Sequence, residues 1–354
     1  MKGIFTISLD FELHWGGFEK WPLVVDRSKL KEESLLSDNR TDRDSYNQYF
    51  LNTRKVIPKM LALFEQYNIH VTWATVGMLM HKDRESLWGN FPNQKPQYWE
   101  QSLSAYSFIE KIGIGDSEEE DPFHYADSLI QQILKTKNQE LGSHSFSHYY
   151  CNEAGQTVEQ FRADLQSAQK AASSYGVKLR SLVFPRNQFN DDYLKACYEE
   201  GFESVRSNPL DWFWNIESTQ NEGAWKRLSR GLDAYFPIGK KNTYTIDSLK
   251  VRDGFPISLP ASRLLRPYRP SELFLNQFKV NRIIQEMQRA ARAGEVYHLW
   301  WHPHNFGYYT EQSLEGLEQI LEGYKKCVTD YGMLSLNMGE LVNLIKPVHE
   351  KEIA

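Results

Sequence analysis

Two histidines four residues apart, His144 and His148, are the residues of this sequence that most directly suggest chemistry. They lie in the segment 142–148 (GSHSFSH), among small hydroxyl residues. If this segment forms a helical turn, both imidazoles share a face and can bind one metal ion. Two solvated histidines at the start of a surface helix would fit the same spacing, so a metal site needs a third ligand from another element.

Asp10 and Glu12 are the candidates for that third ligand. Between Ile4 and Trp15 apolar and polar residues alternate, which is the period-two pattern of a β-strand. An extended strand would point both carboxylates to the same side, so one strand offers two carboxylates to one cavity. A half-exposed edge strand with a wet polar face fits the alternation equally well.

Together these residue types favour metal-assisted hydrolysis of an amide. An ion held by two neutral imidazoles and one carboxylate keeps a position open for water, lowers the pKa of that water and polarises a carbonyl group. The second carboxylate then takes a proton, and an acid must protonate the departing amine. His302, in the segment 300–305 (WWHPHN), is the candidate acid, whereas the histidines expected to be structural are His14, His70 and His298.

The elements that would position these residues alternate between strands and helices along most of the chain. Strands are predicted near residues 4–15, 70–76, 139–141, 180–184, 202–206, 256–260, 295–301 and 333–335. Helical connections between them imply parallel strands, so the sequence predicts an α/β fold, a deformed (β/α) barrel with seven or eight parallel strands. A doubly wound open sheet stays open as an alternative.

The C-terminal ends of the strands form the face where such barrels build their active sites. The residues at those ends are Asp10, the segment 142–148, Arg186, Arg206 and His302. A single domain is predicted over residues 1–350, with excursions at about 20–43, 80–122 and 213–255. The first excursion is a candidate active-site lid. A helix is expected over residues 46–67, kinked or restarted at Pro58.

Composition limits the class of protein and its partners. The chain has 354 residues, 41% of them hydrophobic and 25% charged, which suits a globular protein with a sizeable core. Its net charge of -5 comes without a basic block, which gives no reason to expect nucleic acid or an anionic membrane as partner. Three widely spaced cysteines argue against a disulfide framework, and no signal peptide or membrane span is evident. The expected location is therefore the cytoplasm, and the oligomeric state is not indicated.

Four short motifs in chain order resemble those of the polysaccharide deacetylase family (NodB homology, carbohydrate esterase 4). They are D-F-E at residues 10–12, H-x-x-x-H at 144–148, P-R-N at 185–187 and H-P at 302–303. The resemblance covers almost the whole chain. It implies a deformed (β/α) barrel, one divalent metal ion held by a carboxylate and two histidines, and removal of acetyl groups from N-acetylated sugars.

The resemblance also implies roles for the metal ligands and the base. The metal ligands would be Glu12, His144 and His148, with Zn²⁺ as the default ion, although cobalt, nickel or iron suits the same ligands. Asp10 takes the place of the catalytic base. The usual first motif of the family has adjacent aspartates, whereas Phe11 separates the two carboxylates here, so an exchange of their roles stays open.

The remaining roles that the resemblance implies concern the base, the acid and the substrate. Arg186 takes the place of the arginine that holds the base, and His302 that of the catalytic acid. Asn187 is assigned to substrate binding, and Trp301 is expected to wall the acetyl group, whereas Trp300 is expected to lie in the core. The third motif lacks the usual proline and tyrosine after its arginine, and Asp211, the tentative carboxylate partner of the acid, matches the fourth motif only loosely.

The predicted function is that of a metal-dependent hydrolase that removes an acetyl group from an N-acetylated sugar, in surface polysaccharide or glycoconjugate biosynthesis. Two alternatives stay open. The spaced D-x-E motif is also typical of amidase-like relatives, so an allantoinase-like enzyme acting on a small cyclic amide is the first. The second is a catalytically inactive carbohydrate-binding relative that holds the metal without turnover.

Overall fold

The computed structural model describes residues 1–23, 42–209 and 241–353, with the single residues Trp214, Trp225, Asp233, Tyr235 and Gly239 between them. Side chains are described from residue 46 in the second range and up to residue 346 in the third. Large parts of the predicted excursions at 20–43 and 213–255 therefore lie outside the described residues, as does Asp211.

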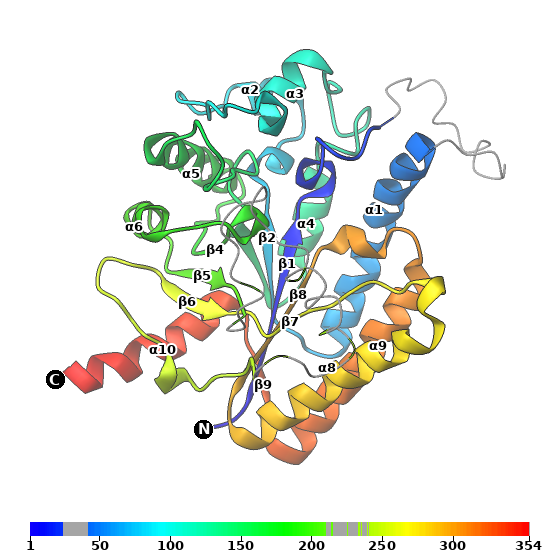
Figure 1. The fold of residues 1–354 in the computed structure, drawn as a ribbon, viewed down its shortest axis with the longest axis vertical. Helices are drawn as coiled ribbons and strands as arrows, with labels where there is room; N and C mark the ends of the chain where they lie inside the picture. Colours follow the sequence, from blue (N-terminus) through cyan, green and yellow to red (C-terminus); the bar gives the residue numbers. More distant parts are fainter. Residues whose placement is uncertain are drawn as a thin grey trace.

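Parallel strands form one curled sheet, in the order β6-β5-β4-β3-β2-β1-β8-β7, with β9 paired to β1 (Figure 1). The strands are β1 (Ile4–Phe11), β2 (Val71–Thr75), β3 (Gln139–Ser143), β4 (Ser181–Val183), β5 (Ser204–Ser207), β6 (Ile257–Pro260), β7 (Arg263–Leu264), β8 (Val296–Trp301) and β9 (Leu334–Ser335). Every pairing between them is parallel. The prediction of a deformed α/β barrel is confirmed.

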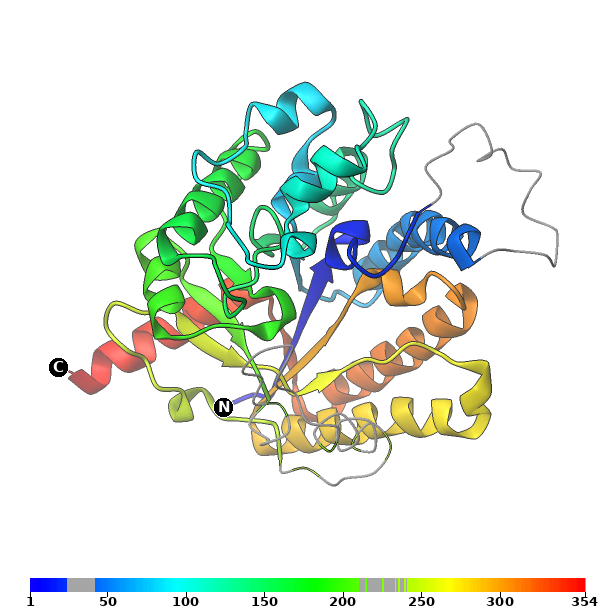
Figure 2. The ribbon, with the colours of Figure 1, turned by 45° about the horizontal axis from the view of Figure 1, so that its top comes forward.

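Helices lie around the outside of the curled sheet (Figure 2). They are α1 (Asp42–Gln66), α2 (Arg84–Trp88), α3 (Ala105–Lys111), α4 (Asp127–Lys135), α5 (Val158–Ser173), α6 (Asp191–Glu199), α8 (Leu273–Ala293), α9 (Thr310–Tyr331) and α10 (Met338–Ile353). No helix in the described ranges is long and apolar enough to cross a membrane. The three cysteines are buried and unpaired.

Pro58 does not interrupt α1, so the helix does not restart there. A proline inside a helix costs about 3 kcal/mol, because its ring replaces one N–H donor. Its neighbours Val56, Ile57 and Met60 are fully buried in the main hydrophobic cluster. We attribute the continuity of α1 to this apolar packing, which outweighs the local cost of the proline.

β1 lies inside the sheet, between β2 and β8, and all of its residues are buried. On one face, Phe5, Ile7, Leu9 and Phe11 join the main hydrophobic cluster. The opposite face carries the polar side chains of the strand, and Asp10 is the last of them. The alternative of a half-exposed edge strand is therefore excluded, and the two candidate carboxylates stand at the C-terminal end of a fixed central strand.

Candidate active site

Glu12, His144 and His148 meet at the C-terminal ends of β1 and β3. One carboxylate oxygen of Glu12, Oε2, lies 3.3 Å from Nε2 of His144 and 2.7 Å from Nε2 of His148. All three side chains are buried, and their potential ligand atoms lie within 4.8 Å of one another. The structure thus brings together the three residues predicted to hold a metal ion.

The segment that carries the two histidines is a tight loop, so the predicted helical turn is wrong. Asp164 of α5 accepts hydrogen bonds from the backbone N–H groups of Phe146 (2.6 Å) and Ser147 (3.1 Å). Ser145 and His148 adopt positive φ angles of 60° and 58°. Because Asp164 satisfies these backbone donors, the loop can bend sharply, and the two imidazole rings lie 5.1 Å apart between centroids.

Asp164→Ala is expected to weaken metal binding by about 10–100-fold, the usual cost of removing a group that orients a ligand. Burial raises the pKa of Asp164 to about 6, although backbone and hydroxyl donors surround it. Titration with Zn²⁺ in competition with a chelator would measure the change. The control is Glu159→Ala, which removes an exposed carboxylate from the same helix. Equal affinities of the two variants would show that the loop keeps its shape without Asp164.

The hydrogen-bond pattern of His144 is compatible with a cation between His144 and Glu12. Its Nδ1 lies 2.8 Å from the carbonyl oxygen of Val183, and a carbonyl only accepts, so this nitrogen carries a proton. In a neutral imidazole, Nε2 then directs a lone pair at an oxygen of Glu12 that is also an acceptor. A divalent cation between these two acceptors would satisfy both, so the donor set fits a metal ion of the zinc type.

His148 faces the same oxygen of Glu12. Burial lowers the pKa of His148, which favours its neutral form. Its Nδ1 lies 3.1 Å from the hydroxyl oxygen of Tyr150, which leaves Nε2 directed toward Glu12. A hydrogen bond to the second ring nitrogen is the usual device that orients a metal-binding histidine.

Asp10 is held by Arg206 of β5, which is 1% exposed. The guanidinium donates two parallel hydrogen bonds to the carboxylate, Nη1 to Oδ1 at 2.6 Å and Nη2 to Oδ2 at 2.8 Å. Burial tends to raise the pKa of Asp10, but the charge of Arg206, aided by His144 and His302, leaves that pKa below its ordinary value. Asp10 is therefore an ionised carboxylate beside the candidate metal ligands.

Arg186, predicted to hold this carboxylate, lies elsewhere. Its guanidinium pairs with Glu19 and lies 3.6 Å from Glu153, and it covers the ring of Tyr150 at 3.9 Å from the centroid. Arg186 has a positive φ of 53° in the turn after β4, which redirects its side chain away from β1. The role in holding Asp10 belongs to Arg206. In the sequence, Arg206 is an arginine at the end of a predicted strand. A charge buried there needs a partner of opposite charge, which was the signal for this role.

Asn187, assigned to substrate, also has a φ of 53°. Its side-chain oxygen accepts a hydrogen bond from Arg206 at 3.1 Å, so it supports the arginine that holds Asp10. We retain a contact with substrate as a prediction only.

Trp300 and Trp301 occupy the opposite faces from those predicted. Trp301 pairs in register with Leu9, is fully buried and stacks on Phe306, so it belongs to the core and is not a wall for substrate. Trp300 faces the inside of the barrel, where its ring covers the guanidinium of Arg206 at 4.1 Å. The reason is the two-residue period of β8, which gives Trp300 and His302 the same face.

The side chain of His302 is 27% exposed, whereas those of Asp10 and Glu12 are buried. Its Nε2 is 3.7 Å from Oδ2 of Asp10 and 3.3 Å from Oε1 of Glu12. His304 Nε2 is 3.9 Å from the same Glu12 oxygen, and burial lowers the pKa of His304 to about 3. Glu12, His302 and His304 therefore form a second group whose ligand atoms lie within 4.8 Å of one another.

Residues 44–205 match the family described as polysaccharide deacetylase. Comparison with curated protein sequences gave no match. A structure described as a polysaccharide deacetylase from Mycobacterium smegmatis has 13% identity and a TM-score of 0.56, over 98% of this chain and 92% of that one.

Two further structures share the fold. One is described as a polysaccharide deacetylase from Pseudomonas aeruginosa PAO1, with 10% identity and a TM-score of 0.53. The other is the PuuE allantoinase, with 11% identity and a TM-score of 0.53. Each covers 96% of this chain and 89% of its own. These likenesses establish the fold, which is that of polysaccharide deacetylases, and the match to the polysaccharide deacetylase family over residues 44–205 covers just under half of the chain.

Proposed function

We propose that this protein is a metal-dependent hydrolase that removes the acetyl group from an N-acetylated sugar. The observation that carries the proposal is the facing pair of acceptors, His144 Nε2 and Glu12 Oε2, 3.3 Å apart. An ionised carboxylate, Asp10, and an imidazole, His302, lie beside this pair. The match of residues 44–205 to the polysaccharide deacetylase family favours an N-acetylated sugar as the substrate.

The roles of the side chains follow from their positions. When bound by Glu12, His144 and His148, a divalent ion such as Zn²⁺ would polarise the amide carbonyl and acidify a water molecule. Asp10, oriented by Arg206, accepts the proton of the attacking water. His302 protonates the departing amine, which is a poor leaving group in its unprotonated form.

The proximity of Asp10 and His302 also closes the proton cycle. The proton that Asp10 gains has only 3.7 Å to cross to His302, which loses one in each turnover. We place the reaction in surface polysaccharide or glycoconjugate biosynthesis, and in the cytoplasm because the cysteines are unpaired. The allantoinase shares only the fold with this chain, so hydrolysis of a cyclic amide is the alternative to be tested.

Acetate release tests the proposal. We expect the zinc-loaded protein to release acetate from N-acetylglucosamine, its oligomers or its nucleotide derivative, and not to open allantoin. The matched control is Asp10→Asn, which should keep the metal and lose roughly 10²–10⁴-fold in turnover, the usual contribution of a positioned base. Glu12→Gln should instead weaken metal binding, and the opposite pattern would exchange the two roles. Turnover of allantoin alone would support the amidase, and bound zinc without any turnover would support the inactive relative.

A further inference from the structure

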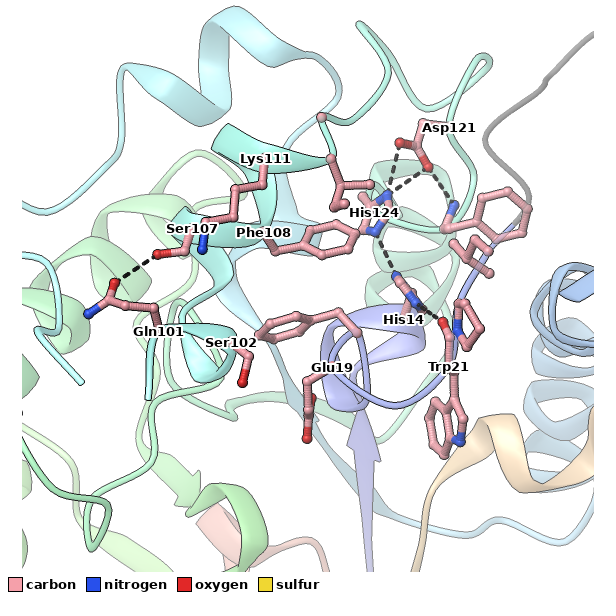
Figure 3. Close-up of a pocket in the computed structure, with 16 residues that line it drawn as sticks. His14, Glu19, Trp21, Gln101, Ser102, Ser107, Phe108, Lys111, Asp121 and His124 are labelled. Carbon is pink, nitrogen blue, oxygen red and sulfur yellow. Dashed lines mark hydrogen bonds and ion pairs between the residues drawn. The ribbon is translucent and has the colours of Figure 1, made fainter. Parts of the chain in front are cut away.

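An apolar cavity of about 410 Å³ opens near the candidate active site (Figure 3). Residues from three segments line it, within 14–23, 101–113 and 121–124. Aromatic rings make up much of its wall, and those of Phe18 and Phe108 lie 5.4 Å apart between centroids. The volume is within the range of sites for small organic ligands.

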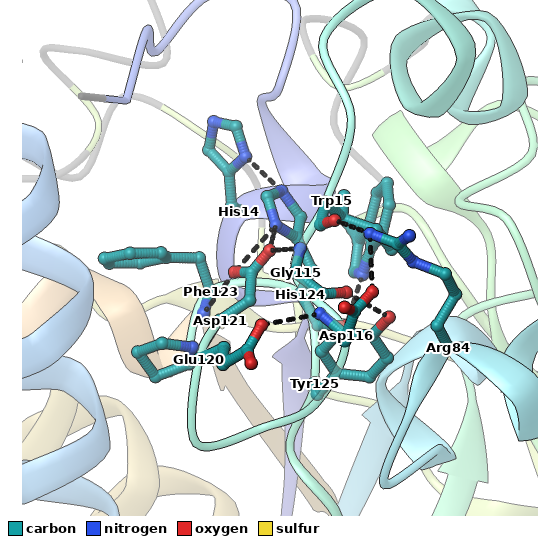
Figure 4. A network of polar contacts seen from close by, with 12 residues as sticks. His14, Trp15, Arg84, Gly115, Asp116, Glu120, Asp121, Phe123, His124 and Tyr125 are labelled. Atoms are coloured by element: carbon teal, nitrogen blue, oxygen red, sulfur yellow. Dashed lines mark hydrogen bonds and ion pairs between the residues drawn. The ribbon is translucent and has the colours of Figure 1, made fainter. Parts of the chain in front are cut away.

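Buried hydrogen bonds connect two of the three segments that line the cavity, 14–23 and 121–124 (Figures 3 and 4). Asp121 accepts a hydrogen bond from Nδ1 of His124 at 2.9 Å and from the backbone N–H of Gly115 at 2.8 Å. Nε2 of His124 lies 2.8 Å from Nδ1 of His14, and Nε2 of His14 donates to the carbonyl of Trp21 at 2.7 Å. Phe108, from the third segment, packs against the rings of His14 and His124, so the walls of the cavity support one another.

The same network shows what kind of group the cavity can hold. The imidazoles of His14 and His124 line the cavity, but their nitrogens bind to each other and to neighbouring groups. Polar side chains line only part of the cavity, so a sugar ring against the aromatic wall would leave some hydroxyl groups without partners, at a cost for each. A hydrocarbon has no such groups, so it fits the wall of aromatic rings better.

A chain of contacts connects the cavity to a candidate metal ligand. Glu19 lines the cavity and pairs with Arg186. Arg186 covers the ring of Tyr150, and the hydroxyl of Tyr150 lies 3.1 Å from Nδ1 of His148. The cavity and the candidate metal site are therefore neighbours, with Glu19, Arg186 and Tyr150 between them.

We propose that the cavity binds an alkyl chain that the substrate carries as the aglycone of its sugar. The identity of this ligand as a substrate rests on the proposed function, whereas binding of the chain does not. The polar residues at the cavity, among them Ser102, Ser107 and Lys111, suit the hydrated part of such an amphiphile.

Binding of alkyl glucosides that lack an amide tests the cavity without turnover. Below their micelle concentrations, n-octyl β-D-glucoside should bind roughly tenfold more tightly than n-hexyl β-D-glucoside, because two more methylene groups are buried. Calorimetry or tryptophan fluorescence would measure both affinities. Ile112→Glu, at a lining residue that is 54% exposed, should abolish the dependence on chain length.

The matched control is Val251→Glu, which places the same charge at a 44% exposed residue outside the cavity and should keep the dependence. Absence of binding, equal affinities for the two glucosides, or equal loss in both variants would overturn the proposal.

A second arm identifies the source of the chain. A lower KM for the octyl glycoside of N-acetylglucosamine than for its methyl glycoside would assign the cavity to an aglycone. A lower KM for N-octanoyl than for N-acetyl glucosamine would assign it to the acyl group. Tight binding of octyl glucoside without hydrolysis of any amide would support the cavity and refute the proposed function. Amide hydrolysis that is insensitive to chain length, without binding of either glucoside, would support the proposed function and refute the role of the cavity.

Discussion

His148→Ala should remove the bound metal and abolish acetate release. The substitution deletes one of three buried ligands and leaves Glu12 and His144 with an incomplete set. Loss of a group that only orients a ligand weakens metal affinity by about 10–100-fold, so loss of the ligand should cost more than that. Elemental analysis of the dialysed protein and an acetate assay would measure the two effects.

His70→Ala is the matched control for this substitution. His70 is partly buried and pairs with Glu340, away from the candidate ligands, so this variant should keep its metal. Equal metal content in the wild type, His144→Ala and His148→Ala would show that the site has been misplaced. Two ions per chain in the wild type would instead implicate the second group, in which Glu12 faces His302 and His304.

His302→Ala should leave the metal content intact and lower amide turnover by roughly 10²–10⁴-fold, the usual contribution of a positioned acid. The reason is that the amine cannot depart until it is protonated. The turnover of an activated acetate ester, whose leaving group departs as an anion, should fall much less in this variant. The ratio of the two losses, measured in one preparation, would separate acid catalysis from a general loss of activity.

Because the side chain of His302 is partly exposed, its replacement by alanine should not disturb folding. Equal losses on the amide and the ester would assign His302 to binding or to structure, and His304 would be the next candidate for the acid. Loss of metal in His302→Ala would show that His302 is a ligand. Asp211, the predicted partner of the acid, lies outside the described residues, so that pairing stays a prediction.

The sequence predicted the features of the site that depend on local periodicity. The strand and helix pattern predicted the curled parallel sheet, and the alternation predicted a strand that carries Asp10. The predicted strand over residues 4–15 is too long, because β1 ends at Phe11, and Glu12 precedes a 3-10 helix at Leu13–Gly16. The same rule applied backward from His302 would also have assigned Trp300 to the inside of the barrel, because residues two apart on a strand share a face. That signal was present in the sequence and was overlooked.

The contacts that sequence reasoning missed cross the barrel or depend on turns. Arg206 reaches Asp10 because the curl of the sheet brings β5 opposite β1, and no local pattern contains this distance. Arg186 turns away because of a positive φ in a single loop residue. The loop at His144 takes its shape from Asp164, which is distant in sequence and belongs to another element. Such partners become apparent only once the sheet is assembled.

The central position of β1 has a consequence for synthesis on the ribosome. β1 leaves the ribosome first, but one of its two edges is covered only by β8, which begins at Val296, about 220 residues after β2 ends at Thr75. At about 5–20 residues per second, that edge stays open for roughly 10–50 s, with an apolar face and the buried carboxylates beside it. The nascent chain therefore has a long interval in which association with a chaperone, or with a second nascent chain, competes with folding.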